Sequence, residues 1–370
     1  MADMRKPLFD LSQVDMQAEL NSYMPGSGLA WPALFPLKYT PSLDIKSIEA
    51  DEGIPVSADV VAFNAKAPQK TRKTVGSWSG QIAKVAIARV KDEKDIKAYN
   101  MLASYASTSG NPNVARQIVD MVFEDVEFCY NGVNYRNEDL ALQIGSKAAL
   151  VLNTTNNNDV VTQETLNWNI PANHKVGVTN KWSVPASSDP LKDIIDGAKV
   201  IKKEGLARPM YAIMEQAAFE NLIMSEKTIK KVASVVLSAT GLANEDSISL
   251  EMVNAYMRSK GYPQIVVIDS YNKQEARDGK QTTYKAWAEN VVVLSPTLQL
   301  GWTWWSDVPQ VEDTAALQAY RDNVKITRFS RLDPMEEVTL AEAYIMPALI
   351  NRSSLYYINT ENSLWNDGNA

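Results

Sequence analysis

Residues 112–145 repeat apolar side chains at intervals close to 3.6, the period of an α-helix. The repeating positions are Ile118, Val122, Val126, Cys129, Val133, Leu140 and Ile144. They predict one helix of about 33 residues, or roughly 50 Å at 1.5 Å per residue. Asn111 is its candidate N-cap, Pro112 suits the first turn, and Gly145 suits the end. Gly132 is the candidate position for a break or kink, because an interior glycine costs about 1 kcal/mol relative to alanine.

Strand-like and helix-like patterns alternate over residues 205–300, which indicates a compact α/β unit. The predicted elements are a strand at 210–214, helices at 215–237 and 249–258, and strands at 264–268 and 290–294. An amphipathic helix at 190–204 precedes them, and extended runs at 148–152 and 166–170 come earlier. The tail returns to strands, at 324–329, 338–346 and 355–358.

The first 50 residues read as an arm. A short helical pattern at 11–23 is followed by four prolines and two glycines within residues 25–41, a density that argues against a regular element. This stretch still carries Trp31 and Phe35, which are too apolar for a free tail. We expect it to lie on a surface, either of its own subunit or of a neighbour.

A long hairpin is predicted next. Two strand-like runs, 54–61 and 79–90, enclose the polar tip NAKAPQKTRKTVGSW at 64–78. The connector is much longer than the usual two to five residues. A hairpin with so little apolar content is only marginally stable alone, so we expect it to need a partner.

Composition and charge change this picture in one respect. With 370 residues, 45% apolar and 22% charged, the chain should fold into two or three units. Its net charge of −7 argues against a protein that grips phosphate backbones. However, residues 64–91 hold seven basic residues and no acidic one, so the rest of the chain carries −14. A nucleic-acid patch would need more aromatics than Trp78 alone, and a contact between subunits fits the charge split better.

Several features limit the compartment. A single cysteine allows no internal disulfide, and the start MADMRKPLFD lacks the apolar stretch of a secretory signal. No window approaches about 18 uninterrupted apolar residues. We expect a soluble protein that folds in a reducing compartment.

Candidate chemistry is sparse. His174 is the only histidine, which excludes metal clusters built from several histidines, and its polar loop predicts a surface position. Cys129, on the apolar face of the long helix, reads as a structural thiol. The acidic pairs at 124–125 and 336–337 are adjacent residues that do not share a face, so a carboxylate dyad is not favoured. No catalytic, cofactor or metal site is predicted.

Trp302, Trp304 and Trp305 form the densest aromatic cluster. Stacking on a sugar or base is one reading. Packing in the core or at an interface is favoured, because tryptophan is a preferred anchor of buried protein contacts.

The order of elements, from proline-rich arm through basic hairpin, long helix and α/β unit to closing strands, resembles the major capsid proteins of tailed bacteriophages, specifically the lambda-type major capsid protein E family. The resemblance runs from about Trp31 to Ile358. It is carried by the segments 135–138 and 141–145, 291–296 with 300–303, and 333–337 with 343–347. Trp304 and Trp305 are heavier than the residues usual in that family.

The resemblance implies an α+β chain with the Hong Kong 97-type phage capsid fold. By position, residues 1–50 would be the N-terminal arm and 51–92 the extended β-hairpin loop. The peripheral domain would be 93–204 with 324–370, its spine helix at about 112–145, and the axial α/β domain 205–323.

Such subunits form pentamers and hexamers of an icosahedral shell around double-stranded DNA, without a catalytic site, cofactor or metal. The implied partners are copies of itself, a separate scaffolding protein, a portal and a decoration protein, in a virion assembled in the bacterial cytoplasm. No long N-terminal scaffolding segment is visible, which is why a separate scaffolding protein is expected.

The expected contact residues belong to the loop and the arm. The loop set is Lys66, Lys70, Arg72, Lys73, Trp78, Lys84 and Arg89, and the arm set is Trp31 and Phe35. Two other functions stay open from the sequence. An encapsulin-like nanocompartment shell protein would share the fold, and neighbouring genes for portal and terminase would separate the two; a non-viral soluble enzyme or binding protein is the other.

Overall fold

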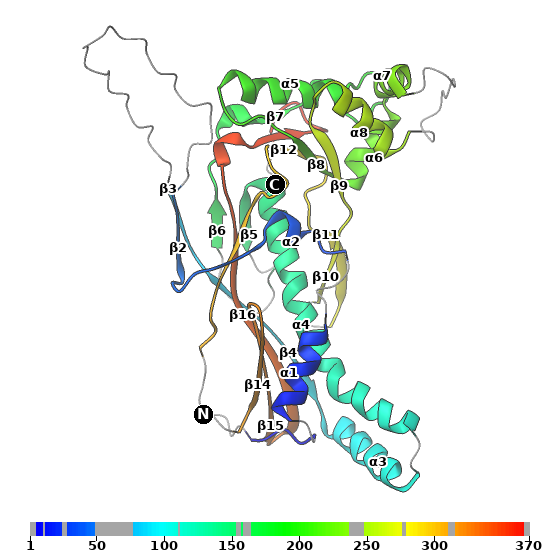
Figure 1. Cartoon of the computed structure of the whole chain (residues 1–370), viewed down its shortest axis with the longest axis vertical. Coiled ribbons are helices and arrows are strands. Elements are labelled where there is room, and N and C mark those ends of the chain that lie inside the picture. Colours follow the sequence, from blue (N-terminus) through cyan, green and yellow to red (C-terminus); the bar gives the residue numbers. More distant parts are fainter. Residues whose placement is uncertain are drawn as a thin grey trace, which may run out of the picture.

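A computed structural model describes residues 5–9, 12–23, 28–48, 77–109, 112–152, 157, 164–236, 248–275, 279–309 and 315–365. The molecule is elongated, with a layer of helices at one end and a long twisted sheet toward the other (Figure 1). The long helix α4, Pro112–Lys147, runs along the sheet between them.

The long sheet is built around β16, Met335–Leu349. One edge of β16 pairs with β4, Ala83–Lys91. The other edge pairs with β15, Val324–Leu332, and then with β13, Gly301–Ser306. Two outer strands complete the sheet: β14, Leu317–Arg321, beside β15, and β1, Leu37–Tyr39, beside β13.

A second sheet has the order β7-β17-β12-β8-β9. Its strands are β7 at Lys175–Gly177, β17 at Tyr356–Asn359, β12 at Val291–Ser295, β8 at Tyr211–Glu215 and β9 at Gln264–Ile268. Successive residues of β12 alternate between two cores, as the period of two requires. Val293 faces the end of α4, whereas Val292 and Leu294 face the helix layer.

The helix layer on this second sheet contains α5 (Pro190–Lys203), α6 (Gln216–Met224), α7 (Glu226–Val236) and α8 (Leu250–Ser259). The remaining helices are α1 (Gln13–Ser22), α2 (Trp31–Leu34) and α3 (Glu93–Ser109). The small two-stranded ladders are β2 (Asp44–Ile48) with β3 (Ser77–Gln81), β5 (Ala149–Leu152) with β6 (Glu164–Asn167), and β10 (Tyr271–Glu275) with β11 (Gln281–Lys285). Short 3₁₀ turns lie at Ala172–His174 and Arg352–Ser354.

The predicted long helix is confirmed and ends two residues later than expected. Its middle, including Val126 and Cys129, packs with α1 against β15 and β16. Its last turns, including Leu140 and Ile144, enter the core between the two sheets. The helix runs through Gly132 without interruption. A Cβ there would lie 2.7 Å from Ile87 Cδ1, so this glycine serves close packing on β4.

The arm and the hairpin differ from expectation. Residues 31–34 form helix α2 despite the prolines, because Pro32 lies in the first turn, where its missing N–H is not needed. The expected first hairpin strand, 54–61, lies outside the described residues. The described hairpin pairs β3 with β2, from the region expected to be arm, and the run 79–90 is split between β3 and β4.

The two sheets also cut across the expected domain boundaries. The strand β17 and the helix α5 were expected in the peripheral domain, yet both belong to the second sheet and its helix layer. The strand β13 was expected in the axial domain and belongs to the long sheet. The run 215–237 is two helices, α6 and α7, separated at Ser225.

Candidate assembly surfaces

The loop residues expected to contact a neighbour fall into three groups. Lys66, Lys70, Arg72 and Lys73 lie outside the described residues. Trp78 lies in β3, opposite Ser47 of β2.

Lys84 and Arg89, in contrast, are engaged within their own chain. Lys84 pairs with Glu342 on the neighbouring strand β16. Arg89 reaches α4, where it lies 3.0 Å from Glu124 and 3.3 Å from Asp125. Lys91, which completes the basic window, also pairs with Asp125. Three of the seven positive charges therefore attach β4 to its own helix and sheet.

The arm residues Trp31 and Phe35 are buried in their own subunit, with exposed fractions of 4% and 0%. Phe35 packs where β13 begins, and an added Cβ at Gly301 would lie 2.5 Å from its ring. This corrects the expectation that the two side chains contact a neighbour. They anchor the arm internally, because both pack into the hydrophobic core between the two sheets.

Glu138 holds this part of the arm in place. Its carboxylate is fully buried and accepts hydrogen bonds from the backbone N–H groups of Ala30 and Trp31, at 3.0 and 2.7 Å. The hydroxyl of Ser270 donates to the same carboxylate, at 2.8 Å. A negative charge at the first turn of α2 satisfies donors that have no partner within the helix.

The tryptophan cluster lies on β13, beside β1. The Lys38 ammonium is 5.2 Å from the ring centre of Trp302 and 4.5 Å from that of Trp304. Trp305 points to the other side, where its ring meets Tyr39 edge-on at 4.9 Å. The aromatic side chains thus pack against their own arm, with cation–π contacts on one face.

The residues considered as candidates for catalysis or metal binding have structural roles. His174 is 1% exposed, which corrects the predicted surface position, and its Nε2 lies 2.7 Å from a carboxylate oxygen of Glu204. Cys129 is buried as expected. In the acidic pairs, Asp125 and Glu337 are buried while Glu124 and Glu336 lie outward.

No group of three or more His, Cys, Asp or Glu among the described residues is placed to hold a metal ion. No helix in the described ranges has the length and apolar content that a membrane crossing requires.

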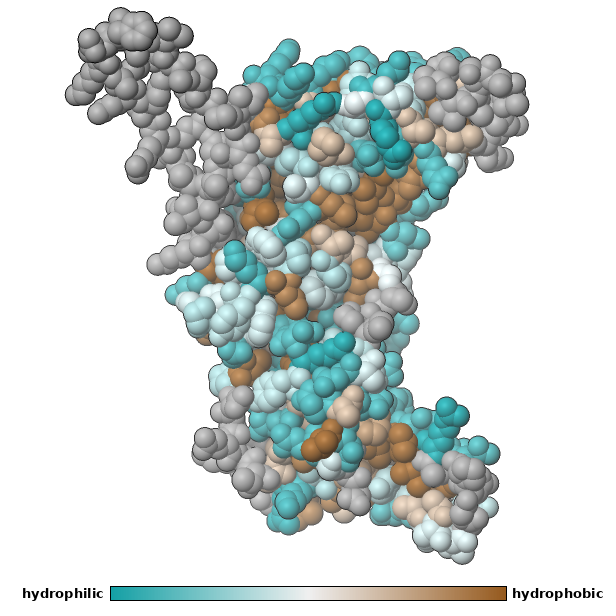
Figure 2. All heavy atoms as spheres, viewed as in Figure 1, coloured by the Kyte–Doolittle hydropathy of each residue, from teal (hydrophilic) through white to brown (hydrophobic). Residues whose placement is uncertain are grey.

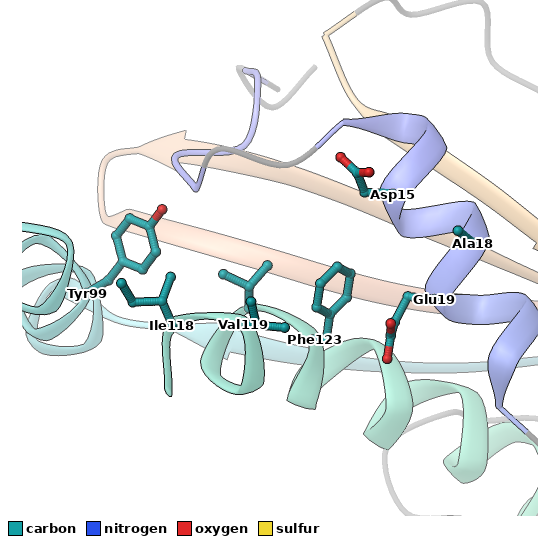
Figure 3. Close-up of a pocket in the computed structure, with 8 residues that line it drawn as sticks. Asp15, Ala18, Glu19, Tyr99, Ile118, Val119 and Phe123 are labelled. Atoms are coloured by element: carbon teal, nitrogen blue, oxygen red, sulfur yellow. The ribbon is translucent and has the colours of Figure 1, made fainter. Parts of the chain in front are cut away.

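One open groove stands out, between α1, α3 and α4, with a volume of about 460 Å³. Figure 3 shows two acidic side chains of α1 on one side and apolar side chains of α3 and α4 on the other. The lining residues are Asp15, Ala18, Glu19, Tyr99, Ile118, Val119, Val122 and Phe123.

Other apolar side chains of α1 and α3 are exposed outside the groove. Met101 and Tyr105 on α3 and Val14 on α1 are all more than half exposed. Figure 2 shows brown patches at the lower right, where Figure 1 places these helices. Exposed apolar side chains that gather in one region are typical of contact surfaces.

Comparisons with known proteins identify the fold. No family model matches the chain, and no curated protein matches its sequence. A solved prophage protein from Escherichia coli CFT073, assigned as a capsid protein, aligns over 94% of this chain and 99% of its own, with a TM-score of 0.57 and 13% identity. The chain has the phage capsid fold.

A second solved structure agrees. A phage-related protein from Bordetella bronchiseptica RB50 aligns over 96% of this chain and 98% of its own, with a TM-score of 0.52 and 17% identity. The expected Hong Kong 97-type capsid fold is therefore confirmed. The groove is a surface of a chain with this capsid fold.

Proposed function

We propose that this chain is the major capsid protein of a tailed bacteriophage. Copies assemble into pentamers and hexamers, which build an icosahedral shell around double-stranded DNA. The observation that carries the proposal is the match of the phage capsid fold over nearly the whole of both chains. Within the proposal the protein is structural, not an enzyme, and is part of the virion.

The charge distribution supports assembly as the mode of action. Lys66, Lys70, Arg72 and Lys73 follow one another within eight residues without an acidic neighbour, on a chain whose net charge is −7. A basic loop on one copy is complementary to an acidic body on the next. A closed symmetric shell repeats this contact many times, so contacts that are weak individually add up.

The proposed partners follow from the same role. The shell is built with a separate scaffolding protein, carries a portal at one vertex and receives a decoration protein on its surface. DNA is enclosed without sequence-specific binding, which the acidic body favours because it has little affinity for phosphates. Assembly takes place in the bacterial cytoplasm.

Electron microscopy of the purified chain, alone and after co-expression with a scaffolding protein from the same genome, tests this function. Closed icosahedral particles of uniform size are expected. A discrete 41 kDa monomer under every condition would overturn the proposal. Particles that enclose a cargo protein, from a gene without portal and terminase neighbours, would instead indicate a nanocompartment.

A further inference from the structure

The groove between α1, α3 and α4 combines an apolar floor with an acidic rim. The floor ranges from Val122, which is 4% exposed, to Val119, which is 50% exposed. The rim is formed by Asp15 and Glu19, the only charged residues of α1. A surface of this kind fits a segment in which apolar residues lie beside basic ones.

Further charged groups lie near the end of α1, among them Arg321, whose guanidinium donates to the carbonyl oxygen of Leu20. Burial raises the pKa of Tyr23, and the charges of Glu19 and Glu127 raise it further, which shows that both carboxylates act on the end of α1. Glu124, one turn away on α4, is offset by Arg89. Glu19 lines the groove, and Glu127 lies on α4 one turn beyond Phe123, which also lines it.

The sequence of this chain contains a matching segment. Residues 54–63 read IPVSADVVAF, ending in Phe63, and they are followed within ten residues by Lys66, Lys70, Arg72 and Lys73. Apolar side chains therefore directly precede a concentrated positive charge. The helices α5 and α7 offer no such concentration of positive charge, since both mix acidic with basic residues.

We propose that this groove receives the basic loop, residues 63–73, of a second copy of the chain. Phe63 and its apolar neighbours fill the floor, while the lysines and Arg72 lie against Asp15 and Glu19. The assignment rests on the proposed function, because assembly is what brings two copies into register.

The placement of the loop favours a second copy over the same chain. Ile48 and Ser77 are paired, so the two ends of the segment 49–76 lie side by side. Figure 1 places this base at the opposite side of the molecule from α1 and α3. A segment of that length, with its ends together, reaches outward by at most about 50 Å, which is the scale of a contact between adjacent subunits.

Site-directed cross-linking tests the assignment directly. Ala18 is exposed and lines the groove, so Ala18→Cys places a thiol there, and Lys70→Cys places one in the loop. The two variants carry different tags and are assembled together, then treated with a short bismaleimide. Cys129, the only native cysteine, is buried and does not compete.

The expected product is a linked pair with both tags, in assembled particles and not in free subunits. Lys199→Cys, on exposed α5, replaces Ala18→Cys as the control and should give no such pair. A link confined to one chain, a link to the scaffolding protein in place of the loop, or intact particles without any link would each overturn the assignment.

A charge exchange gives a second measurement. Asp15→Lys with Glu19→Lys should lower the particle yield by roughly tenfold or more, because the contact is lost at every repeat. Adding Lys70→Glu and Arg72→Glu to the same chain should restore particles. Folding is checked by circular dichroism of the free subunit. If the unaltered chain forms no particles, the proposed function fails; if particles form and tolerate the α1 reversal, only the groove assignment fails.

Discussion

At the scale of single residues, buried polar groups hold together segments that are distant in sequence. Glu138 joins α4 to the first turn of α2 and to the turn after β9, through three hydrogen bonds to one carboxylate. A buried charge is tolerated only when its hydrogen bonds are made. Glu138 therefore sets the position of the arm more precisely than the apolar contacts around it.

Glu138→Gln tests this role. The substitution keeps the shape but removes the charge and points an amide N–H at a backbone N–H. We expect a loss of about 2 kcal/mol in the free energy of unfolding, the range for hydrogen bonds to a charged group. Urea unfolding of the free subunit, with hydrogen exchange at Ala30 and Trp31, measures it. Glu289→Gln, at an exposed carboxylate, is the control; equal midpoints for the two variants would refute the role.

Cys129 gives a prediction about pH. Burial, with the nearby charge of Asp125, raises the pKa of its thiol to about 12. The native chain at pH 8 should react with a thiol reagent on the order of 1000-fold more slowly than the unfolded chain, since about three pKa units separate the two thiols.

The same shift makes the folded state less stable in alkali. Above pH 9 the unfolded thiol loses its proton while the folded one keeps it, so the free energy of unfolding falls between pH 9 and pH 12. Ala18→Cys, an exposed thiol, is the reference for labelling at pH 8. Rapid labelling of native Cys129 at that pH would contradict the buried position.

At the scale of elements, the two sheets meet where the chain passes from β12, in the second sheet, to β13, which pairs with β16 in the long sheet. At Gly301, the first residue of β13, an added Cβ would lie 2.1 Å from the carbonyl oxygen of Ala348. At Gly132 in α4 the nearest atom is a terminal methyl of Ile87, at 2.7 Å. A backbone oxygen in a sheet cannot move aside, whereas a terminal methyl can.

The two glycines should therefore respond differently to alanine. Gly301→Ala is expected to cost about 3 kcal/mol or more of the free energy of unfolding, as overpacking against a rigid neighbour does. Gly132→Ala should stay within about 1 kcal/mol of the unaltered chain, because the gain in helix propensity offsets the shift of Ile87. Thermal unfolding of the two variants, measured side by side, tests this difference. Similar melting temperatures would show that the backbone around Gly301 shifts to accept a Cβ.

How far the sequence predicts these elements depends on what determines each one. The helix at 112–147 and the strand at 264–268 are set by local periodicity, and both were predicted nearly to the residue. The strand β13 and the helix α3 were missed, since the aromatic run of β13 shows no alternation and α3 has only a weak apolar stripe. Pairings such as β17 with β12 join residues about 65 apart, which no local pattern encodes.

The candidate surfaces likewise include features that the sequence predicts and features that only the fold reveals. The concentration of charge at Lys66 to Lys73 is visible in the sequence alone. The partners of Lys84 and Arg89 are not, because they come from β16 and α4 through long-range pairing. The groove is formed by three helices, and its only sequence signal was the pair Asp15 and Glu19 on a helix without a basic residue.

At the scale of the whole molecule, the fold shows which positive charges of residues 64–91 are paired within the chain. Residues 64–91 carry seven positive charges, and three of them, on Lys84, Arg89 and Lys91, form ion pairs within their own chain. The four remaining charges lie within eight residues. A small, concentrated charge on a long loop is well suited to a reversible contact, strengthened by repetition and weakened by salt.

Reversing Lys70, Arg72 and Lys73 to glutamate should therefore give a folded subunit that forms no particles. The three residues supply most of the charge in the loop tip, so the reversal turns attraction by an acidic neighbour into repulsion. Negative-stain microscopy counts the particles, and circular dichroism confirms the fold. The matched control reverses Lys192, Lys199 and Lys230, exposed lysines of α5 and α7, and shifts the net charge by the same amount. Normal particles from the loop variant would refute the role of the loop, and loss of particles in both variants would trace the effect to net charge alone.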